Sequence, residues 1–228
     1  MNKIILALDT SSLEEAINTT KKIKNKIFTV KLGLEFFNAN GKDGIKKFNE
    51  IGITNLMLDL KLKDIPQTIY KAIKALDDIQ FGFITVHGQG GIEMIKQAKK
   101  AASEIKSQPK IMIVTILTTL NDDDLKNMGN DNTVIQQVEK LAKVAKQTEV
   151  GVVCSGHEAK IVRKIIGPNL LIFTPGIRMA NDSKNDQKRV CTPAESIKNG
   201  SNKIIMGRSL IKGNVEENID KVSNSIKE

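Results

Sequence analysis

Short runs of apolar, β-branched and aromatic residues recur along the chain, and amphipathic stretches lie between most of them. The runs are continuous rather than alternating, which is typical of parallel strands that are covered on both faces. They predict strands over Ile4–Leu8, Phe28–Leu32, Asn55–Leu60, Phe81–Val86, Lys110–Leu117, Glu149–Cys154, Leu170–Thr174 and Lys203–Met206. Helical periodicity predicts helices that include Leu13–Lys24, Thr68–Leu76, Ile92–Ile105, Val134–Lys146 and Glu158–Ile166.

Three helix starts carry the capping-box pattern, in which a Ser or Thr is followed three residues later by Glu. The pairs are Ser12 with Glu15, Ser155 with Glu158, and Thr192 with Glu195, the last with Pro193 at the first helical position.

The alternation of strands and helices predicts an α/β fold. Eight strands in 228 residues leave about 28 residues for each strand–helix unit, close to the minimum for a (β/α)8 TIM barrel. An open doubly wound sheet is the alternative, because alternation alone does not show that a sheet closes. Since no linker or low-complexity tract divides the chain, we expect a single (β/α)8 barrel domain over residues 1–228.

Composition narrows the class of protein. Hydrophobic residues make up 40% and charged residues 27%, which is ordinary for a globular protein. The 2 cysteines, Cys154 and Cys191, are too few for a disulfide scaffold or a Cys-rich zinc module. The five apolar residues before Asp9 are too few for the core of a signal peptide, and no apolar run approaches the roughly 20 residues that span a bilayer. We therefore expect a soluble, cytoplasmic protein with no membrane partner.

The formal charge of +9 raises the question of nucleic-acid binding. The lysines are spread over helical segments, and aromatic residues make up only 4% with no Trp, so a stacking platform for bases is missing. We expect no nucleic-acid partner, because binding needs a patch or motif beyond net charge. Arginine is more informative, since three of only four arginines (Arg178, Arg189 and Arg208) fall close together and a guanidinium binds phosphate bidentately.

Two polar stretches interrupt the alternation of predicted strands and helices. Asn121–Asn132 resembles a calcium-binding loop, but aligning Gly129 with the obligatory glycine puts Lys126 at a ligand position, and no Glu closes the loop. We interpret it as a solvated turn. Gly176–Arg189 follows a predicted strand, where long loops of barrel proteins carry function.

Charged residues interrupt the apolar strands at their carboxyl ends. Strand alternation points Asp59 and Lys61 to the same side, and Asp9 and Lys31 lie at the ends of the first two strands. Because buried ions are costly unless they are paired, we interpret these four as a cluster with charged lysines and ionised carboxylates. Such a cluster can set negative charge against a leaving carboxylate and a proton against the carbanion that remains. A simple salt bridge, with Asp64 as a helix cap, is the alternative.

The last two strands are followed by residues suited to a phosphate. Pro175, Gly176 and Arg178 follow the seventh strand, and Gly207 and Arg208 follow the eighth. Barrels of this kind often bind phosphate there, with backbone N–H groups at a helix start as donors. Turn glycines with surface arginines are the alternative.

With these motifs the chain resembles the orotidine 5′-phosphate decarboxylase family along nearly its whole length. The matching stretches are LALD at 6–9, VKLGLEFF at 30–37, LDLKLKDIPQT at 58–68, TVHGQGG at 85–91, TILTT at 115–119, VVCSGHEA at 152–159, TPGIR at 174–178, DQKRVCTPAE at 186–195 and IMGRSLI at 205–211. The DxKxxD element is shared with sugar-phosphate relatives, whereas DIPxT, TPGIR and DQKRV are specific. The chain departs from the family at Met179 and Ser209, where proline is usual, and at HGQGG.

The resemblance implies conversion of orotidylate to uridylate and carbon dioxide, the last step of uridylate synthesis, with no metal or organic cofactor. Lys61 would protonate C6 of a carbanion-like intermediate, Asp59 would face the substrate carboxylate, and Lys31 would hold the network. Asp64, with Ile65 and Thr68, would reach into the site of a neighbouring chain in a homodimer. The substrate-binding residues would be Asp9, Lys31, Asp59, Ile65, Thr68, Thr118, Pro175, Arg178, Gln187, Gly207 and Arg208.

The remaining candidates have simpler interpretations. We expect His87 to make a structural hydrogen bond, His157 to lie on the surface, Cys154 to fill buried space and Cys191 to be partly exposed. Two other functions stay open: a magnesium-dependent sugar-phosphate lyase or decarboxylase, and a basic barrel that binds RNA or a protein.

Overall fold

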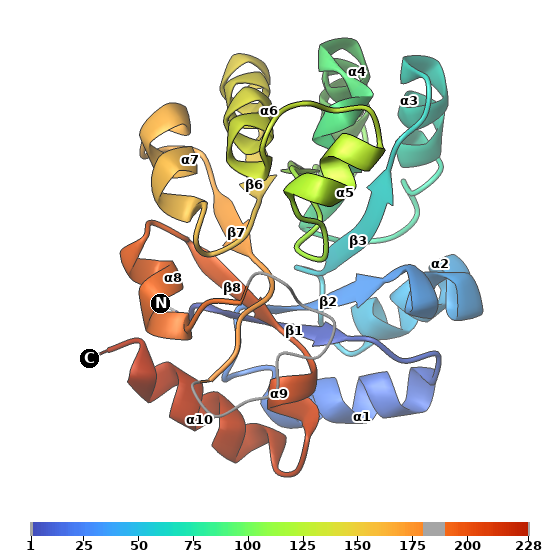
Figure 1. Ribbon diagram of the computed structural model, residues 1–228. Coiled ribbons are helices and arrows are strands. Elements are labelled where there is room, and N and C mark those ends of the chain that lie inside the picture. Colours follow the sequence, from blue (N-terminus) through green and yellow to red (C-terminus); the bar gives the residue numbers. More distant parts are fainter. Residues whose placement is uncertain (1, 180–189, 228) are drawn as a thin grey trace.

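The structure, a computed structural model, describes residues 2–179 and 190–227. Within these residues, eight parallel strands pair in chain order and the last pairs with the first, which closes a barrel (Figure 1). The strands are β1 (Ile4–Leu8), β2 (Thr29–Gly33), β3 (Met57–Leu62), β4 (Phe83–His87), β5 (Lys110–Val114), β6 (Gly151–Val153), β7 (Ile172–Thr174) and β8 (Lys203–Met206). The predicted (β/α)8 barrel is confirmed, and the open sheet is excluded because β1 pairs with β8.

Helices surround the barrel and connect successive strands (Figure 1). They are α1 (Leu13–Ile23), α2 (Leu34–Glu50), α3 (Pro66–Lys74), the 3-10 turn η1 (Gly88–Gly90), α4 (Ile92–Ser103), α5 (Asp122–Asn127), α6 (Val134–Thr148), α7 (Ala159–Ile166), α8 (Pro193–Lys198), α9 (Arg208–Ile211) and α10 (Val215–Ser225). Among the described residues, none of these helices combines the length and apolar character that crossing a membrane requires.

Of the three predicted capping boxes, one is complete and two are only partly formed. Thr192 and Glu195 form the complete capping box. The Ser12 hydroxyl accepts from the Glu15 N–H, but the Glu15 carboxylate bonds to the Thr10 hydroxyl instead of closing the box.

The box at Ser155 is only half formed. The Glu158 carboxylate accepts from the Ser155 N–H, whereas the Ser155 hydroxyl accepts from the His157 N–H. The helix that follows begins at Ala159.

Several predicted boundaries are wrong by a few residues. Strand β5 ends at Val114, so residues 115–117 belong to a loop. Glu149, predicted to begin a strand, instead ends α6 in the left-handed conformation with a φ of 54°. Helix α3 begins at Pro66 because proline fits the first helical turn. The predicted strands from Phe28, Asn55, Phe81 and Leu170 begin one or two residues later than expected.

The stretch 121–132 is not a simple turn. It contains α5, which a capping box between Asn121 and Asp124 starts. Asn and Asp are common both at helix N-caps and in turns, so composition alone could not distinguish a short helix from a turn.

Two apolar layers hold the barrel. The larger lies between strands and helices, and the smaller fills the barrel interior with Ile5, Ala7, Met57, Phe83, Met112, Val114, Val153, Phe173 and Ile205. The Phe83 and Phe173 rings pack edge to face with centroids 5.0 Å apart, and the Lys203 ammonium lies 3.9 Å from the Phe28 ring centroid. The interior is thus apolar between the Lys203 ammonium at the amino end and the polar residues at the carboxyl ends of the strands.

Candidate active site

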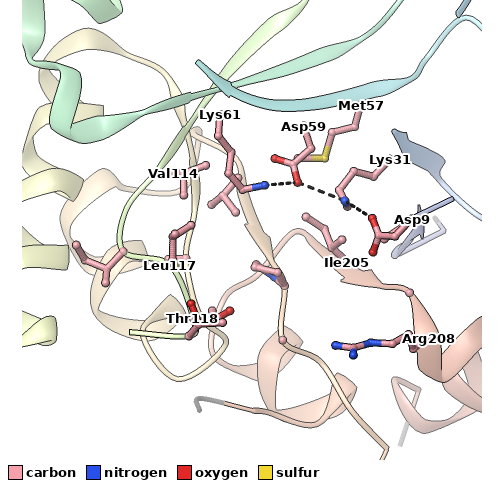
Figure 2. Close-up of a pocket in the computed structure, with 18 of the residues that line it drawn as sticks. Asp9, Lys31, Met57, Asp59, Lys61, Val114, Leu117, Thr118, Ile205 and Arg208 are labelled. Carbon is pink, nitrogen blue, oxygen red and sulfur yellow. Dashed lines mark hydrogen bonds and ion pairs between the residues drawn. The ribbon is translucent and has the colours of Figure 1, made fainter. Parts of the chain in front are cut away.

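A cavity of about 350 Å3 opens at the carboxyl ends of the strands (Figure 2). The residues that line it come from the ends of β1, β2, β3, β5, β6, β7 and β8 and from the loops that follow. Nine sequence-predicted site residues are brought together in its wall: Asp9, Lys31, Asp59, Lys61, Thr118, Pro175, Arg178, Gly207 and Arg208.

Four charged side chains form a row of alternating sign along one wall (Figure 2). Lys31 Nζ lies 3.1 Å from Asp9 Oδ1 and 3.3 Å from Asp59 Oδ2. Lys61 Nζ lies 2.8 Å from the same Oδ2 of Asp59. Asp59 and Lys61 therefore lie on the same side, as alternation predicted, and Asp59 receives two cations at one oxygen.

The centre of this row is buried. Lys31 and Asp59 are each 8% exposed, so water screens their charges weakly. Burial alone would lower the pKa of Lys31, but the charges of Asp59 and Asp9 outweigh it and raise that pKa. Burial alone would raise the pKa of Asp59, yet Lys31 and Lys61 lower it below its usual range. The row thus keeps Lys31 charged and Asp59 ionised.

A buried hydroxyl that sequence reasoning missed supports the row. Thr85 on β4 donates to Asp59 Oδ1 at 2.9 Å and accepts from the Lys61 N–H at 2.8 Å. Its position in an apolar strand, inside the TVHGQGG stretch, was the available signal.

Another part of the wall carries the two arginines. Arg178 is buried and its Nη1 donates to the Ile177 carbonyl at 2.9 Å, whereas Arg208 is exposed at the start of α9. A Cβ added to Gly207 would lie 3.4 Å from Ala7 Cβ and 3.5 Å from Asp9 Oδ2, so glycine leaves room beside the carboxylate. The two arginines make this part of the wall suitable for a dianion.

Other predicted site residues lie elsewhere. Within the described ranges, Asp64, Ile65 and Thr68 are exposed and outside the cavity wall. The Asp64 carboxylate accepts from the Ile65 N–H at 2.7 Å, and the N-cap position of α3 is Ile65, so the alternative of Asp64 as the helix cap is wrong. Gln187 lies outside the described residues.

The apolar wall of the cavity was missed by sequence reasoning. Many of its members stand two residues before a charged or polar wall residue, as Ala7 precedes Asp9 and Met57 precedes Asp59. In a strand, that spacing places both side chains on the inward face, so it could have identified Ala7 and Met57. The residues missed are Ala7, Met57, Val114, Ile116, Leu117, Thr119, Val153, Cys154 and Ile205.

The expectations for the histidines and cysteines are only partly confirmed. Nδ1 of His87 is buried without a hydrogen-bond partner among the described residues, so the expected structural bond is not found at that atom. Burial, followed by the charges of Lys63 and Lys61, lowers the pKa of His87. His157 is exposed as expected, and its Nε2 lies 2.5 Å from the Val190 carbonyl oxygen.

Both thiols are buried. That confirms the expectation for Cys154, which also lines the cavity, but the partial exposure expected of Cys191 is wrong. Burial and the nearby Glu195 carboxylate raise the pKa of Cys191 to about 11, so this thiol is a poor nucleophile at neutral pH.

Comparisons with known proteins agree with this geometry. The model of the "Orotidine 5′-phosphate decarboxylase / HUMPS family" matches residues 2–221. Proteins named orotidine 5′-phosphate decarboxylase from Sphingopyxis alaskensis and a Wolbachia of Culex pipiens are 39% and 41% identical, covering 91% and 92% of both chains compared. A crystal structure of orotidine 5′-phosphate decarboxylase from Lactobacillus acidophilus superposes with a TM-score of 0.84 at 34% identity and covers 100% of both chains. This chain therefore belongs to the orotidine 5′-phosphate decarboxylase / HUMPS family.

Proposed function

We propose that this protein decarboxylates orotidine 5′-phosphate to uridine 5′-phosphate without a metal or organic cofactor. The observation that carries the proposal is that the row Asp9, Lys31, Asp59 and Lys61 lines the same cavity as two arginines. The DIPQT and DQKRV stretches favour this substrate over those of the sugar-phosphate relatives.

The row of charges suits carbon–carbon bond cleavage at C6 of the pyrimidine. The ionised Asp59 would face the substrate carboxylate, and the C6–carboxylate bond would break with its electron pair left on C6. The adjacent Lys61 ammonium would then donate a proton to C6, which yields uridylate and carbon dioxide. Fixed charges with weak solvent screening act strongly on such a carbanion-like intermediate.

The rest of the cavity would hold the nucleotide. Arg178, Gly207 and Arg208 would bind the phosphate together with Gln187, while Asp9 and Lys31 would contact the ribose. Thr118 would meet the pyrimidine edge, and Pro175, which also lines the cavity, would contact the substrate. Binding energy from a phosphate remote from the reacting bond can then be used to organise the charged row.

A homodimer with shared sites belongs to the same proposal. Asp64, Ile65 and Thr68 lie on the surface just after β3, where they can reach a second chain. Ile65 is 67% exposed and Leu34 is 51% exposed, and a second chain packed on them would remove their apolar surface from water. A single barrel domain over the whole chain and a cytoplasmic location remain predictions alongside it.

Calorimetry with uridylate and with 6-modified uridylates, followed by an absorbance assay with orotidylate, tests the proposal. We expect tight binding, turnover and no loss of activity in a chelator. Activity that a chelator removes and magnesium restores would favour the sugar-phosphate alternative. Salt-sensitive RNA binding without nucleotide affinity would favour the binding-protein alternative.

A further inference from the structure

The strand that carries Asp59 and Lys61 bulges beside its neighbour β4. Leu58 pairs with Ile84 and Leu62 pairs with Val86, so the three residues from Asp59 to Lys61 face Thr85 alone. Lys61 has a φ of 48°, in the left-handed region that non-glycine residues seldom occupy. A bulge of this kind takes backbone groups out of the regular ladder and leaves them in need of other partners.

The Thr85 hydroxyl supplies such a partner. It lies 2.8 Å from the Lys61 backbone nitrogen and 2.9 Å from Asp59 Oδ1, and Thr85 is 0% exposed. Because a backbone N–H can only donate, the hydroxyl accepts there and directs its single proton to the carboxylate. One side chain therefore fixes the backbone of one member of the pair and the carboxylate of the other.

The carboxylate of Asp59 is held at both oxygens as a result. Oδ1 receives Thr85, while Oδ2 receives Lys61 at 2.8 Å and faces Lys31 at 3.3 Å. Rotation of the carboxylate would break the bond to Thr85, so the hydroxyl holds the carboxylate in the orientation that presents one oxygen to both cations.

We propose that Thr85 is a positioning residue that holds Asp59 and Lys61 in their reactive arrangement at the bulge. It does not line the cavity wall and so acts through these two residues rather than on the substrate. The inference rests on the proposed function for the roles of Asp59 and Lys61.

The test compares Thr85→Val, which keeps the shape but removes both hydrogen bonds, with Thr85→Ser, which keeps the hydroxyl. We expect Thr85→Val to lower kcat by about 10- to 100-fold, the range for losing a hydrogen bond to a charged group. The affinity for uridylate, which lacks the carboxylate, should be unchanged, and Thr85→Ser should retain most of kcat. This split between kcat and product affinity separates positioning from general loss of structure.

Thr115→Val is the matched control. Thr115 is also a buried threonine near the carboxyl end of a strand, but its hydroxyl donates to the Val153 carbonyl at 3.1 Å. We expect it to lower the unfolding midpoint without the loss of kcat. Parent-like kcat in Thr85→Val, equal losses in Thr85→Ser, or an equal loss in Thr115→Val would each overturn the inference. If Thr85→Val does not fold, Thr85→Cys, with its weaker donor and acceptor, takes its place and should show an intermediate kcat.

A crystal structure of the variant gives a readout that needs no activity. We expect Asp59 Oδ2 and Lys61 Nζ to move apart from their 2.8 Å separation, or Lys61 to leave the left-handed region. An unchanged arrangement would overturn the inference even if the parent protein had no decarboxylase activity. Lack of parent activity would by itself contradict only the proposed function.

Discussion

The ammonium nitrogen of Lys61 lies 2.8 Å from Oδ2 of Asp59, although the strand that carries both residues leaves its regular course between them. In a regular strand the two side chains would stand on one face at a fixed spacing. Here the left-handed backbone at Lys61, whose N–H bonds to Thr85, brings the ammonium group onto the carboxylate. The ion pair therefore depends on a local irregularity as well as on strand alternation.

Removal of the Lys61 ammonium should abolish turnover while leaving the phosphate half of the cavity intact. We expect Lys61→Ala to lower kcat by at least about a hundredfold, because a positioned proton donor typically contributes a hundredfold to ten-thousandfold. Uridylate binding should be largely kept. The decrease in pyrimidine absorbance measures turnover, and calorimetry measures binding.

Lys63→Ala is the matched control for this change. Lys63 is an exposed lysine of the same segment that lies outside the cavity wall. Its removal should leave turnover near the parent value. Substantial turnover in Lys61→Ala would contradict the assignment of Lys61 as proton donor.

Stability should decrease at both extremes of pH because of the buried charges. The pKa of Asp59 is lowered in the folded chain, so its contribution is present above the unfolded value of about 4 and is lost as pH decreases through the folded value. The pKa of Lys31 is raised, so its contribution is present below about 10.4 and is lost as pH increases through the folded value.

Asp59→Asn tests the acid side of this argument. The variant should be less stable than the parent at pH 7, because the buried Lys31 loses one of the two carboxylates that it contacts in the described part of the chain. Its free energy of unfolding should also decrease less between neutral pH and pH about 3, because the unfolded variant has one carboxylate fewer that takes up a proton. Urea unfolding midpoints across this range measure the difference, and parallel curves for the two proteins would refute the linkage.

The sequence was sufficient to predict the barrel and the charged row because both have strong patterns. Continuous apolar strands mark the barrel, and a charge inside such a strand, as at Lys31 or Asp59, has few explanations other than a site. The bulge at Lys61 was not predictable, since it depends on how β3 aligns with β4 and not on a local motif. The burial of Cys191 also arises from tertiary contacts: its backbone forms a bridge with Ile177.

The phosphate assignment predicts that Arg208 distinguishes nucleotide from nucleoside. Arg208→Ala should weaken uridylate binding by about 10- to 100-fold, the range for one charge-assisted hydrogen bond, and leave uridine binding unchanged. Calorimetry with both ligands measures the difference. Lys212→Ala, an exposed cation just after α9 and outside the cavity wall, should change neither affinity. Equal weakening for uridine and uridylate would contradict a phosphate role.

The shared site predicts complementation between two inactive proteins. Lys61→Ala and Asp64→Ala subunits, once exchanged, should form heterodimers in which one site has both a normal Lys61 and a normal Asp64. Activity should therefore reappear on mixing. The mixture of Lys61→Ala with Asp59→Asn is the control and should stay inactive, because both residues belong to the same half of a site. If exchange is demonstrated and activity does not return, Asp64 does not act across the interface.

Arg163 should matter for stability and not for chemistry. Its guanidinium donates to the carbonyls of Gly167 at 2.6 Å, Leu170 at 2.7 Å and Gly200 at 2.9 Å, and to Asn202 Oδ1 at 2.5 Å. These bonds join α7 to the loop before β7 and to the turn before β8.

A lysine at position 163 keeps the charge but loses the planar fork that reaches several acceptors at once. We expect Arg163→Lys to lower the free energy of unfolding by about 1 kcal/mol or more, because several half-buried carbonyl oxygens lose their donor. The kcat of the folded variant should be unchanged, since Arg163 lies outside the cavity wall. Lys164→Ala, the exposed neighbour, should alter the free energy of unfolding by no more than about 0.5 kcal/mol in the same urea titration. Equal unfolding midpoints for Arg163→Lys and the parent would show that the fork does not stabilise this corner of the barrel.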